Sequence, residues 1–109
     1  MAALGAAADR CCVAKADLRD IAALRRAVDD LRATLGGPIA VLVDNAAGDD
    51  RHAIDQVTPD HWDERMATNL RHQFFAAQAV KDEMIAAGGG AIVNMSSISF
   101  LLGQGGMPA

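Results

Sequence analysis

The sequence predicts an α/β fold built on parallel strands, and three observations lead to this class. Short, mostly apolar runs without strict alternation occur at residues 11–16, 39–43 and 91–95, as expected of buried strands in a parallel sheet. Two longer segments, at 20–35 and about 60–87, repeat apolar residues with the period of a helix. No hairpin signal joins the strands, which favours right-handed crossovers through the helices. We therefore expect three parallel strands and two main helices.

The first half of the chain contains one strand, one helix and the start of a second strand. The run at 11–16 predicts a strand that ends at Asp17. The segment 20–35 predicts a helix, which Gly36, Gly37 and Pro38 stop, with glycine past its end and proline beyond. Its apolar face consists of Ile21, Leu24, Val28, Leu31 and Leu35.

The second half repeats this order. The unbroken apolar run 39–43 predicts a fully buried strand, followed by the small and polar residues 44–48 and the charged loop 49–52. Thr58 and Pro59 are typical of a helix start, as cap and first turn. This helix can run to about residue 87, before a glycine run at 88–90 and the last strand. We expect its inner stripe to contain Trp62, Met66, Leu70, Gln73, Phe74, Ala77, Val80 and Met84.

Composition limits the class of protein. The chain has 109 residues, enough for one small domain, and a formal charge of -4, which argues against nucleic acid or an anionic membrane as partner. Glycines and polar residues interrupt the uncharged stretch 84–109, and no basic leader opens the chain, so we expect a soluble, cytoplasmic protein. Cys11 and Cys12 are adjacent, which disfavours a disulfide between them. The three histidines show no ligand spacing with these cysteines, so we expect no metal site.

Polar or small residues follow all three predicted strands. Parallel strands place their carboxyl ends on one edge, where ligands bind in open α/β sheets. Asp17 follows the first strand, residues 44–48 the second, and Ser96 and Ser97 the third, so together they predict a ligand cleft. Taken singly, Asp17 is equally typical of a helix start, and the serines of a turn. Asn69 lies on the inner stripe of the second helix, where its amide needs partners, with local backbone as the simpler alternative.

Three of these motifs resemble those of the short-chain dehydrogenase/reductase family. Residues 44–47, Asp-Asn-Ala-Ala, resemble its Asn-Asn-Ala-Gly motif. Asn69, within 66–70, is similar to its active-site asparagine, and the segment 92–97 to the one that holds its catalytic serine. The motifs fall in the family's order and on the expected elements. The resemblance implies that residues 1–109 form an incomplete, Rossmann-like dinucleotide-binding domain, without its first strands and its C-terminal part.

The resemblance also implies roles for single residues. The cofactor would be NAD or NADP, with Asp17 near its adenine ring. Asn45 and Ala46 would line the adenosine ribose, and Ala47 would lie beside them in the cofactor site. Ser97 would hold the substrate oxygen, while Asn69 would anchor a water in the proton relay. The reaction would be hydride transfer between the nicotinamide and a small alcohol, sugar or carbonyl substrate.

The chain departs from the family pattern at several points. Asp44 and Ala47 replace an asparagine and a glycine of the motif, and the glycine-rich pyrophosphate loop and the strand that selects NAD or NADP are missing. The family's tyrosine would fall at position 110, and the sequence contains none; the lysine that follows it is also absent. We therefore expect a fragment that is inactive alone. Its first strand would lack a neighbour, so we expect marginal folding.

Other readings of function remain open. The chain could be a non-catalytic, truncated protein that binds a partner subunit, or a module that binds a dinucleotide without turnover. The resemblance implies a homo-oligomer formed through the helix 60–87. Residues 49–52 and 69–73 further resemble the sugar dehydrogenases of the family, which would indicate an aldose or polyol substrate. The alternative for the first of these segments is a solvated, charged loop.

Overall fold

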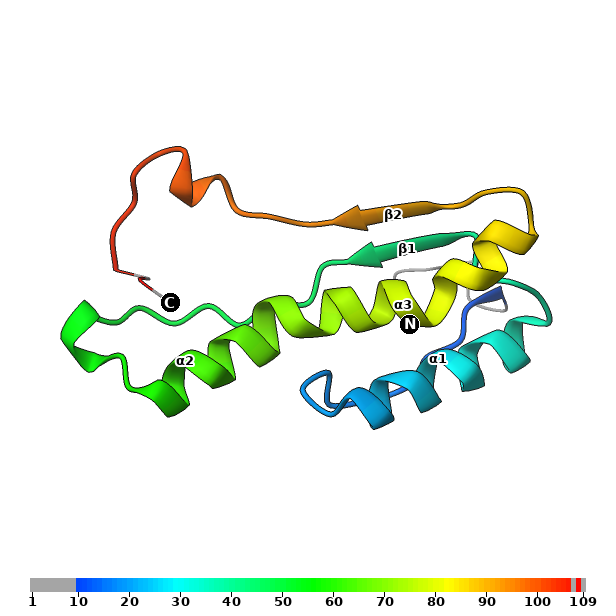
Figure 1. Ribbon diagram of the computed structural model, residues 1–109, viewed down its shortest axis with the longest axis horizontal. Helices are drawn as coiled ribbons and strands as arrows, with labels where there is room; N and C mark the ends of the chain where they lie inside the picture. The colour runs from blue at the N-terminus through cyan, green and yellow to red at the C-terminus, as the bar shows by residue number, and fades with distance from the viewer. Residues whose placement is uncertain (1–9, 107, 109) are drawn as a thin grey trace.

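A computed structural model of the chain describes residues 10–106 and 108. Helices and strands alternate along these residues, as expected of an α/β protein (Figure 1). No helix among them is long and apolar enough to cross a membrane. In chain order the elements are α1 (Ile21–Leu35), β1 (Val41–Asp44), the 3-10 turn η2 (Ile54–Gln56), α2 (Pro59–Met66), the π-helical turn η3 (Ala67–Arg71), α3 (His72–Ala86), β2 (Ala91–Asn94) and the 3-10 turn η4 (Ile98–Phe100).

The two strands form a parallel pair. Val41 lies opposite Ala91 and Asp44 opposite Asn94, so the strands end at the same edge. One further hydrogen bond extends the ladder beyond this edge, from the Met95 amide to the Asp44 carbonyl over 2.9 Å. The crossover between the strands is the long helical segment α2–η3–α3 (Figure 1). This arrangement confirms the parallel order predicted for the second and third strands.

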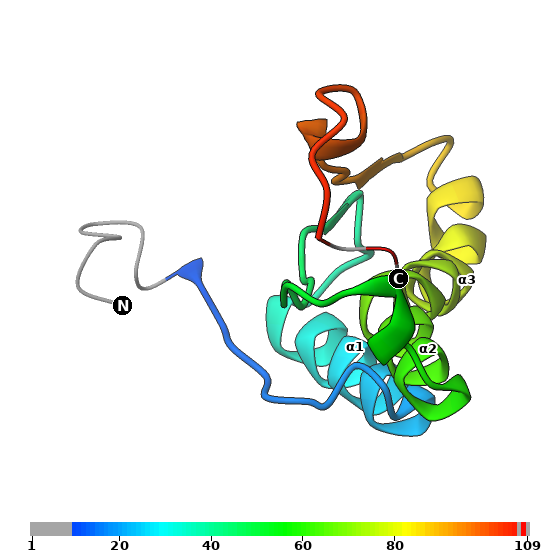
Figure 2. The same cartoon turned by 90° about the vertical axis from the view of Figure 1, so that its left-hand side faces the viewer.

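The prediction of a first strand at 11–16 is wrong. These residues are extended but belong to no strand, and in Figure 2 they run away from the body of the molecule. Val13, in the middle of the run, is 78% exposed. A strand needs a neighbour that satisfies its amides and carbonyls, and the described part of the chain provides none for this segment. The sheet therefore contains two described strands where three were expected.

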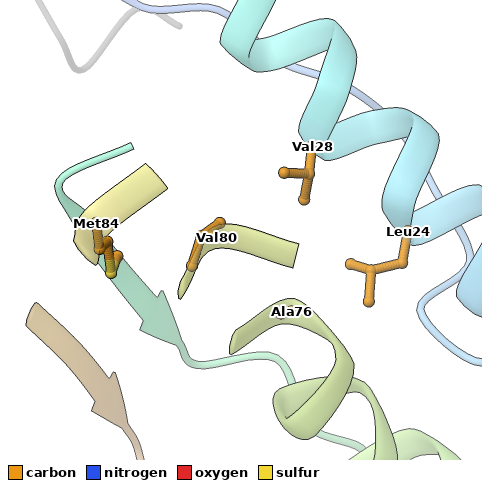
Figure 3. Packing of buried hydrophobic residues seen from close by; sticks show 5 residues of the cluster. All are labelled: Leu24, Val28, Ala76, Val80 and Met84. Carbon is orange, nitrogen blue, oxygen red and sulfur yellow. The ribbon is translucent and has the colours of Figure 1, made fainter. Parts of the chain in front are cut away.

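The hydrophobic core lies between the helices and one face of the sheet. Leu24 and Val28 of α1 point toward Val80 and Met84 of α3, with Ala76 completing the cluster (Figure 3). Val80 is completely buried. Such interdigitated contacts between two helices and a sheet are the main source of stability in a small α/β unit.

The prediction that both described strands are fully buried is also wrong. Leu42 packs against the core, but Val41 and Val43 point to the other face and are more than half exposed. Ile92 and Val93 of β2 are exposed to a similar degree. Unbroken apolar runs are typical of sheets covered on both faces, whereas in the described residues α3 packs against β1 and α1 packs against α3 (Figures 1 and 2).

The first helix forms over the predicted residues, but of its predicted apolar face Leu35 is 57% exposed. Asp20 caps it, because its side chain accepts hydrogen bonds from the amides of Ala22 and Ala23, and Gly36 ends it with φ of 73°. Arg32 near its end makes two hydrogen bonds to the carboxylate of Glu83, at 2.9 and 2.8 Å. The same carboxylate accepts the Ile39 amide at 3.1 Å, so it ties α1, α3 and the approach to β1 together.

The long helix begins and ends as predicted, but its inner face differs. Thr58 caps α2 through the His61 amide and Pro59 occupies the first turn. Of the expected stripe, Val80 and Met84 are buried, whereas Leu70 and Phe74 are 59% and 67% exposed and Trp62 is also exposed. The π-helical turn η3 adds a residue to one turn and shifts the phase of the faces on either side. The buried positions on α3 are His72, Ala76, Val80 and Met84, spaced by four.

Candidate functional site

The ends of the two strands and the middle of the long helix enclose one cavity of about 540 Å³. Its walls come from the loop after β1, from η3 and the first turn of α3, and from the segment after β2. This is the edge at which ligands bind in open parallel sheets. Five of the six residues predicted for the site lie around it, namely Asn45, Ala46, Ala47, Asn69 and Ser97.

Asn69 holds the loop after β1 in place. Its side-chain oxygen accepts a hydrogen bond from the Gly48 amide over 2.8 Å, in a partly buried position. The same residue's backbone carbonyl accepts from the side-chain amide of Gln73 at 3.0 Å. Gly48 has little room for a side chain, since a Cβ there would lie 3.2 Å from atoms of Arg65 and Thr68. The side-chain oxygen of Asn69 is therefore bound by the backbone of a distant loop, which the sequence pattern did not identify.

Ser97 has the turn-forming role that the sequence offered as one alternative. It caps η4, because its hydroxyl oxygen accepts a hydrogen bond from the Ser99 amide at 3.2 Å. Its hydroxyl also lies 2.9 Å from that of Ser99, and both serines border the cavity. Ser97 is exposed, so its hydroxyl is accessible to a molecule in the cavity. Ser97 is thus a turn-forming residue whose hydroxyl borders the cavity.

Asp17 lies outside this cavity, in a second hollow that shares Ala46 and Ala47 with it. Arg19 binds both of its carboxylate oxygens, with the shortest contact at 2.8 Å, and a hydrogen bond from this side chain lowers the pKa of Asp17 to about 2. Arg19 also reaches Glu64 at 3.1 Å. The structure therefore brings Asp17 to the edge of the site as an ionised group that already has a partner.

A buried polar pair beneath the site was not predicted. Asp44 at the end of β1 is 6% exposed and His72 at the start of α3 is 2% exposed. Burial raises the pKa of the Asp44 carboxyl, while the nearby charge of His72 acts in the opposite direction. One Asp44 oxygen and both His72 ring nitrogens have no hydrogen-bond partner among the described residues. The signal available in the sequence was Asp44 itself, a carboxylate at the motif position where the family has an asparagine.

Comparison with known proteins agrees with this architecture. The sequence profile described as short chain dehydrogenase matches residues 1–109. Among curated proteins, the chain is 53% identical over 95 residues to the probable galactose dehydrogenase GalD of Rhizobium meliloti (strain 1021), covering 87% of this chain and 37% of that protein. It is 43% identical over 89 residues to a D-xylose 1-dehydrogenase of Caulobacter vibrioides, covering 82% of this chain and 34% of the relative. The chain thus spans about a third of the length of these relatives.

Solved structures show the same likeness in three dimensions. A gluconate 5-dehydrogenase from Burkholderia cenocepacia J2315, in complex with NADP and tartrate, superposes with a TM-score of 0.73 at 37% identity, covering 84% of this chain and 36% of that one. A putative short-chain alcohol dehydrogenase from Sinorhizobium meliloti 1021 gives a TM-score of 0.72 at 36% identity, over 79% and 34% of the two chains. These likenesses confirm the partial Rossmann-like fold. The chain therefore belongs to the short-chain dehydrogenase family.

Proposed function

We propose that this chain is the middle part of the dinucleotide-binding domain of an NAD(P)-dependent dehydrogenase that acts on a sugar or polyol. The observation that carries the proposal is the cavity at the strand ends, which gathers Asn45, Ala46, Ala47, Asn69 and Ser97. The relatives with the highest identities cited above are named as galactose and xylose dehydrogenases. The adjacent, free cysteines are in keeping with a reducing, cytoplasmic location.

The residues present fit part of a nicotinamide dinucleotide. Ala46 and Ala47 form a small-residue ridge between the two hollows, which would let a ligand approach the backbone closely. Asn45 and Ala46 would contact the adenosine ribose, and the ionised Asp17 would accept a hydrogen bond near the adenine. The bound nicotinamide would supply the hydride chemistry. Ser97 would hold the substrate oxygen, and Asn69 would hold a water.

Polar groups around the cavity support a polyhydroxylated substrate. Asp49 and Asp50 border it from the loop after β1, and Gln73 from α3. Carboxylate and amide groups bind sugar hydroxyls as acceptors and donors in several directions. A sugar therefore fits this cavity better than a long apolar alcohol does.

We further propose that the 109-residue chain does not catalyse the reaction alone. In this family, as the resemblance implies, a tyrosine and a lysine provide the acid and base, and this sequence has no tyrosine. The alternative function is dinucleotide binding without turnover, which the two hollows on either side of Ala46 and Ala47 favour.

Calorimetry with NAD and NADP, combined with a turnover assay on galactose, xylose and gluconate, tests both proposals. We expect no turnover and measurable binding of one dinucleotide. Ala47→Leu should abolish binding, because the larger side chain would occupy the space where the two hollows meet. Ala33→Leu, on the exposed side of α1, should leave binding unchanged. Turnover by the chain alone would refute its inactivity. Binding that survives Ala47→Leu would place the dinucleotide elsewhere and refute the assigned site.

The exposed face of the long helix supports a homo-oligomer as the assembled form. Leu70 and Phe74 are large, apolar and one turn apart, and both are more than half exposed. Burying them against a second copy would remove this surface from water. Sedimentation equilibrium should show self-association that Phe74→Glu abolishes and Thr34→Glu, on the exposed side of α1, does not. A monomer at all concentrations would refute this mode of assembly.

A further inference from the structure

Asp50, His52 and His61 form a cluster in which Asp50 borders the cavity and His52 lines a separate hollow against the segment after β2. One potential ligand atom from each residue lies within 4.8 Å of those from the other two. The two imidazole rings meet edge to face, with centroids 4.7 Å apart. The sequence comparison of histidines with cysteines missed this group, because its members come from a loop and from the first turn of α2 and share no familiar spacing.

The hydrogen bonds of His52 leave one ring nitrogen available. Its Nδ1 lies 3.0 Å from the backbone carbonyl of Asp50, and a carbonyl can only accept, so Nδ1 carries the proton. In the neutral ring Nε2 then holds a free lone pair. This Nε2 is buried and has no partner among the described residues, and the same is true of Nε2 in His61. Two buried imidazole nitrogens without partners are costly unless a ligand satisfies them.

Both histidines are held by their backbones. The His61 amide donates to the Thr58 hydroxyl at 3.1 Å as part of the α2 cap. The His52 amide donates to the Gly106 carbonyl at 2.8 Å, which fixes it against the segment after β2. A histidine whose second ring nitrogen bonds a carbonyl, on a fixed backbone, is the usual arrangement of a metal ligand.

We propose that Asp50, His52 and His61 bind one divalent transition-metal ion of the zinc type. Two imidazoles and a carboxylate suit Zn²⁺ and its neighbours, whereas Mg²⁺ and Ca²⁺ prefer oxygen ligands alone. Tetrahedral ligands at about 2.0–2.1 Å from zinc lie roughly 3.4 Å apart, so ligand atoms that are up to 4.8 Å apart without the ion would move together by about 1 Å or more on binding. The ion would join the loop to the start of α2 and keep at least one coordination position open beside the cavity.

Arg65 is the feature that opposes this site. Its guanidinium is paired with one oxygen of Asp50, which brings a positive charge close to the ion. The other carboxylate oxygen is left for the metal. Removing this charge should therefore tighten binding, which distinguishes the assigned site from non-specific attachment to histidines.

Zn²⁺ titration calorimetry on the chain tests the site without nicotinamide or sugar, so its outcome is independent of the proposed dehydrogenase function. Cys11→Ser and Cys12→Ser are introduced first, because thiols also bind zinc. We expect one saturable site, weakened at least tenfold by His52→Gln and by His61→Gln. Asp55→Asn, in the same loop but outside the cluster, should change nothing.

Two further measurements guard against a loss of folding in the variants. The Arg65→Gln variant should bind Zn²⁺ several times more tightly than the parent. An unfolded chain would not show this gain, because the ion pair between Arg65 and Asp50 belongs to the folded structure. Co²⁺ should give visible d–d bands that disappear in the double variant His52→Gln/His61→Gln. The proposal is overturned if the parent shows no saturable site, if the double variant binds Zn²⁺ as the parent does, or if Arg65→Gln does not tighten binding.

Discussion

Replacing Asn69 with alanine should release the loop after β1 from the long helix. The Gly48 amide donates to the Asn69 side chain over 2.8 Å in a partly buried position. Loss of the acceptor leaves that donor unsatisfied, which costs about 1–3 kcal/mol. Local opening at Gly48 should then become roughly 5- to 150-fold more frequent, and its amide should exchange with solvent faster by the same factor.

Hydrogen exchange measured by NMR, residue by residue, tests this prediction. Asn69→Asp retains an acceptor oxygen and should restore most of the protection. Gln73→Ala is the matched control, because it removes a hydrogen bond to the backbone of residue 69 and leaves the bond to Gly48 intact. Unchanged exchange at Gly48 in Asn69→Ala would show that packing alone positions the loop. Equal acceleration across the whole chain would indicate global destabilisation instead.

Three stability predictions can be checked by urea unfolding. Val80→Ala should lower the free energy of unfolding by about 2–3 kcal/mol, because it removes two buried methyl groups and leaves a cavity. Val43→Ala, at a half-exposed position, should lower it by less than about 1 kcal/mol. Similar losses in the two variants would contradict the described core. Glu83→Gln should make the fold less stable at neutral pH, because hydrogen bonds from Arg32 lower the pKa of Glu83 in the folded chain. The difference in unfolding free energy between the parent and the variant should vanish as pH falls from 4.5 through that lowered pKa. Asp44→Asn should make the fold more stable, because burial raises the pKa of the Asp44 carboxyl. The gain in unfolding free energy should be full above that raised pKa and should decline toward pH 3.8. A gain that does not depend on pH would exclude this cause.

The sequence predicted the elements whose signals are local. Gly36 and Thr58 were expected to end and to begin a helix, and the structure contains both helix ends. The apolar runs before Asp44 and Asn94 form paired strands, because each run has the other as its hydrogen-bonding neighbour. The run at 11–16 carries the same kind of signal, but a strand depends on a neighbour that the run itself does not encode.

Burial was harder to predict than secondary structure. The helical period alone could not reveal the π-helical turn η3, which redirects the inner face toward His72 and Ala76 and leaves Phe74 exposed. Residues after the strands could be expected to border one cavity because strand ends have a fixed place in a parallel sheet, whereas the roles predicted for them came from the family resemblance alone. Contacts between distant segments, such as that of Gly48 with Asn69, depend on side-chain geometry that spacing does not determine.

The two sides of the candidate site are held by different forces. The strand-end side rests on the strand pair, on the buried α1–α3 core and on the bond from Gly48 to Asn69. The segment with Asp17 packs against the core through Leu18, and it is also attached through Arg19, which pairs with Glu64 and whose carbonyl accepts a hydrogen bond from Arg71 at 2.8 Å. These polar contacts are exposed, and exposed ion pairs contribute little and are screened by salt. Because Ala46 and Ala47 border both hollows, the proposed binding of a cofactor would require the segment with Asp17 to stay docked against the strand ends. That docking combines the apolar contact of Leu18 with exposed ion pairs, so salt should weaken only its electrostatic part.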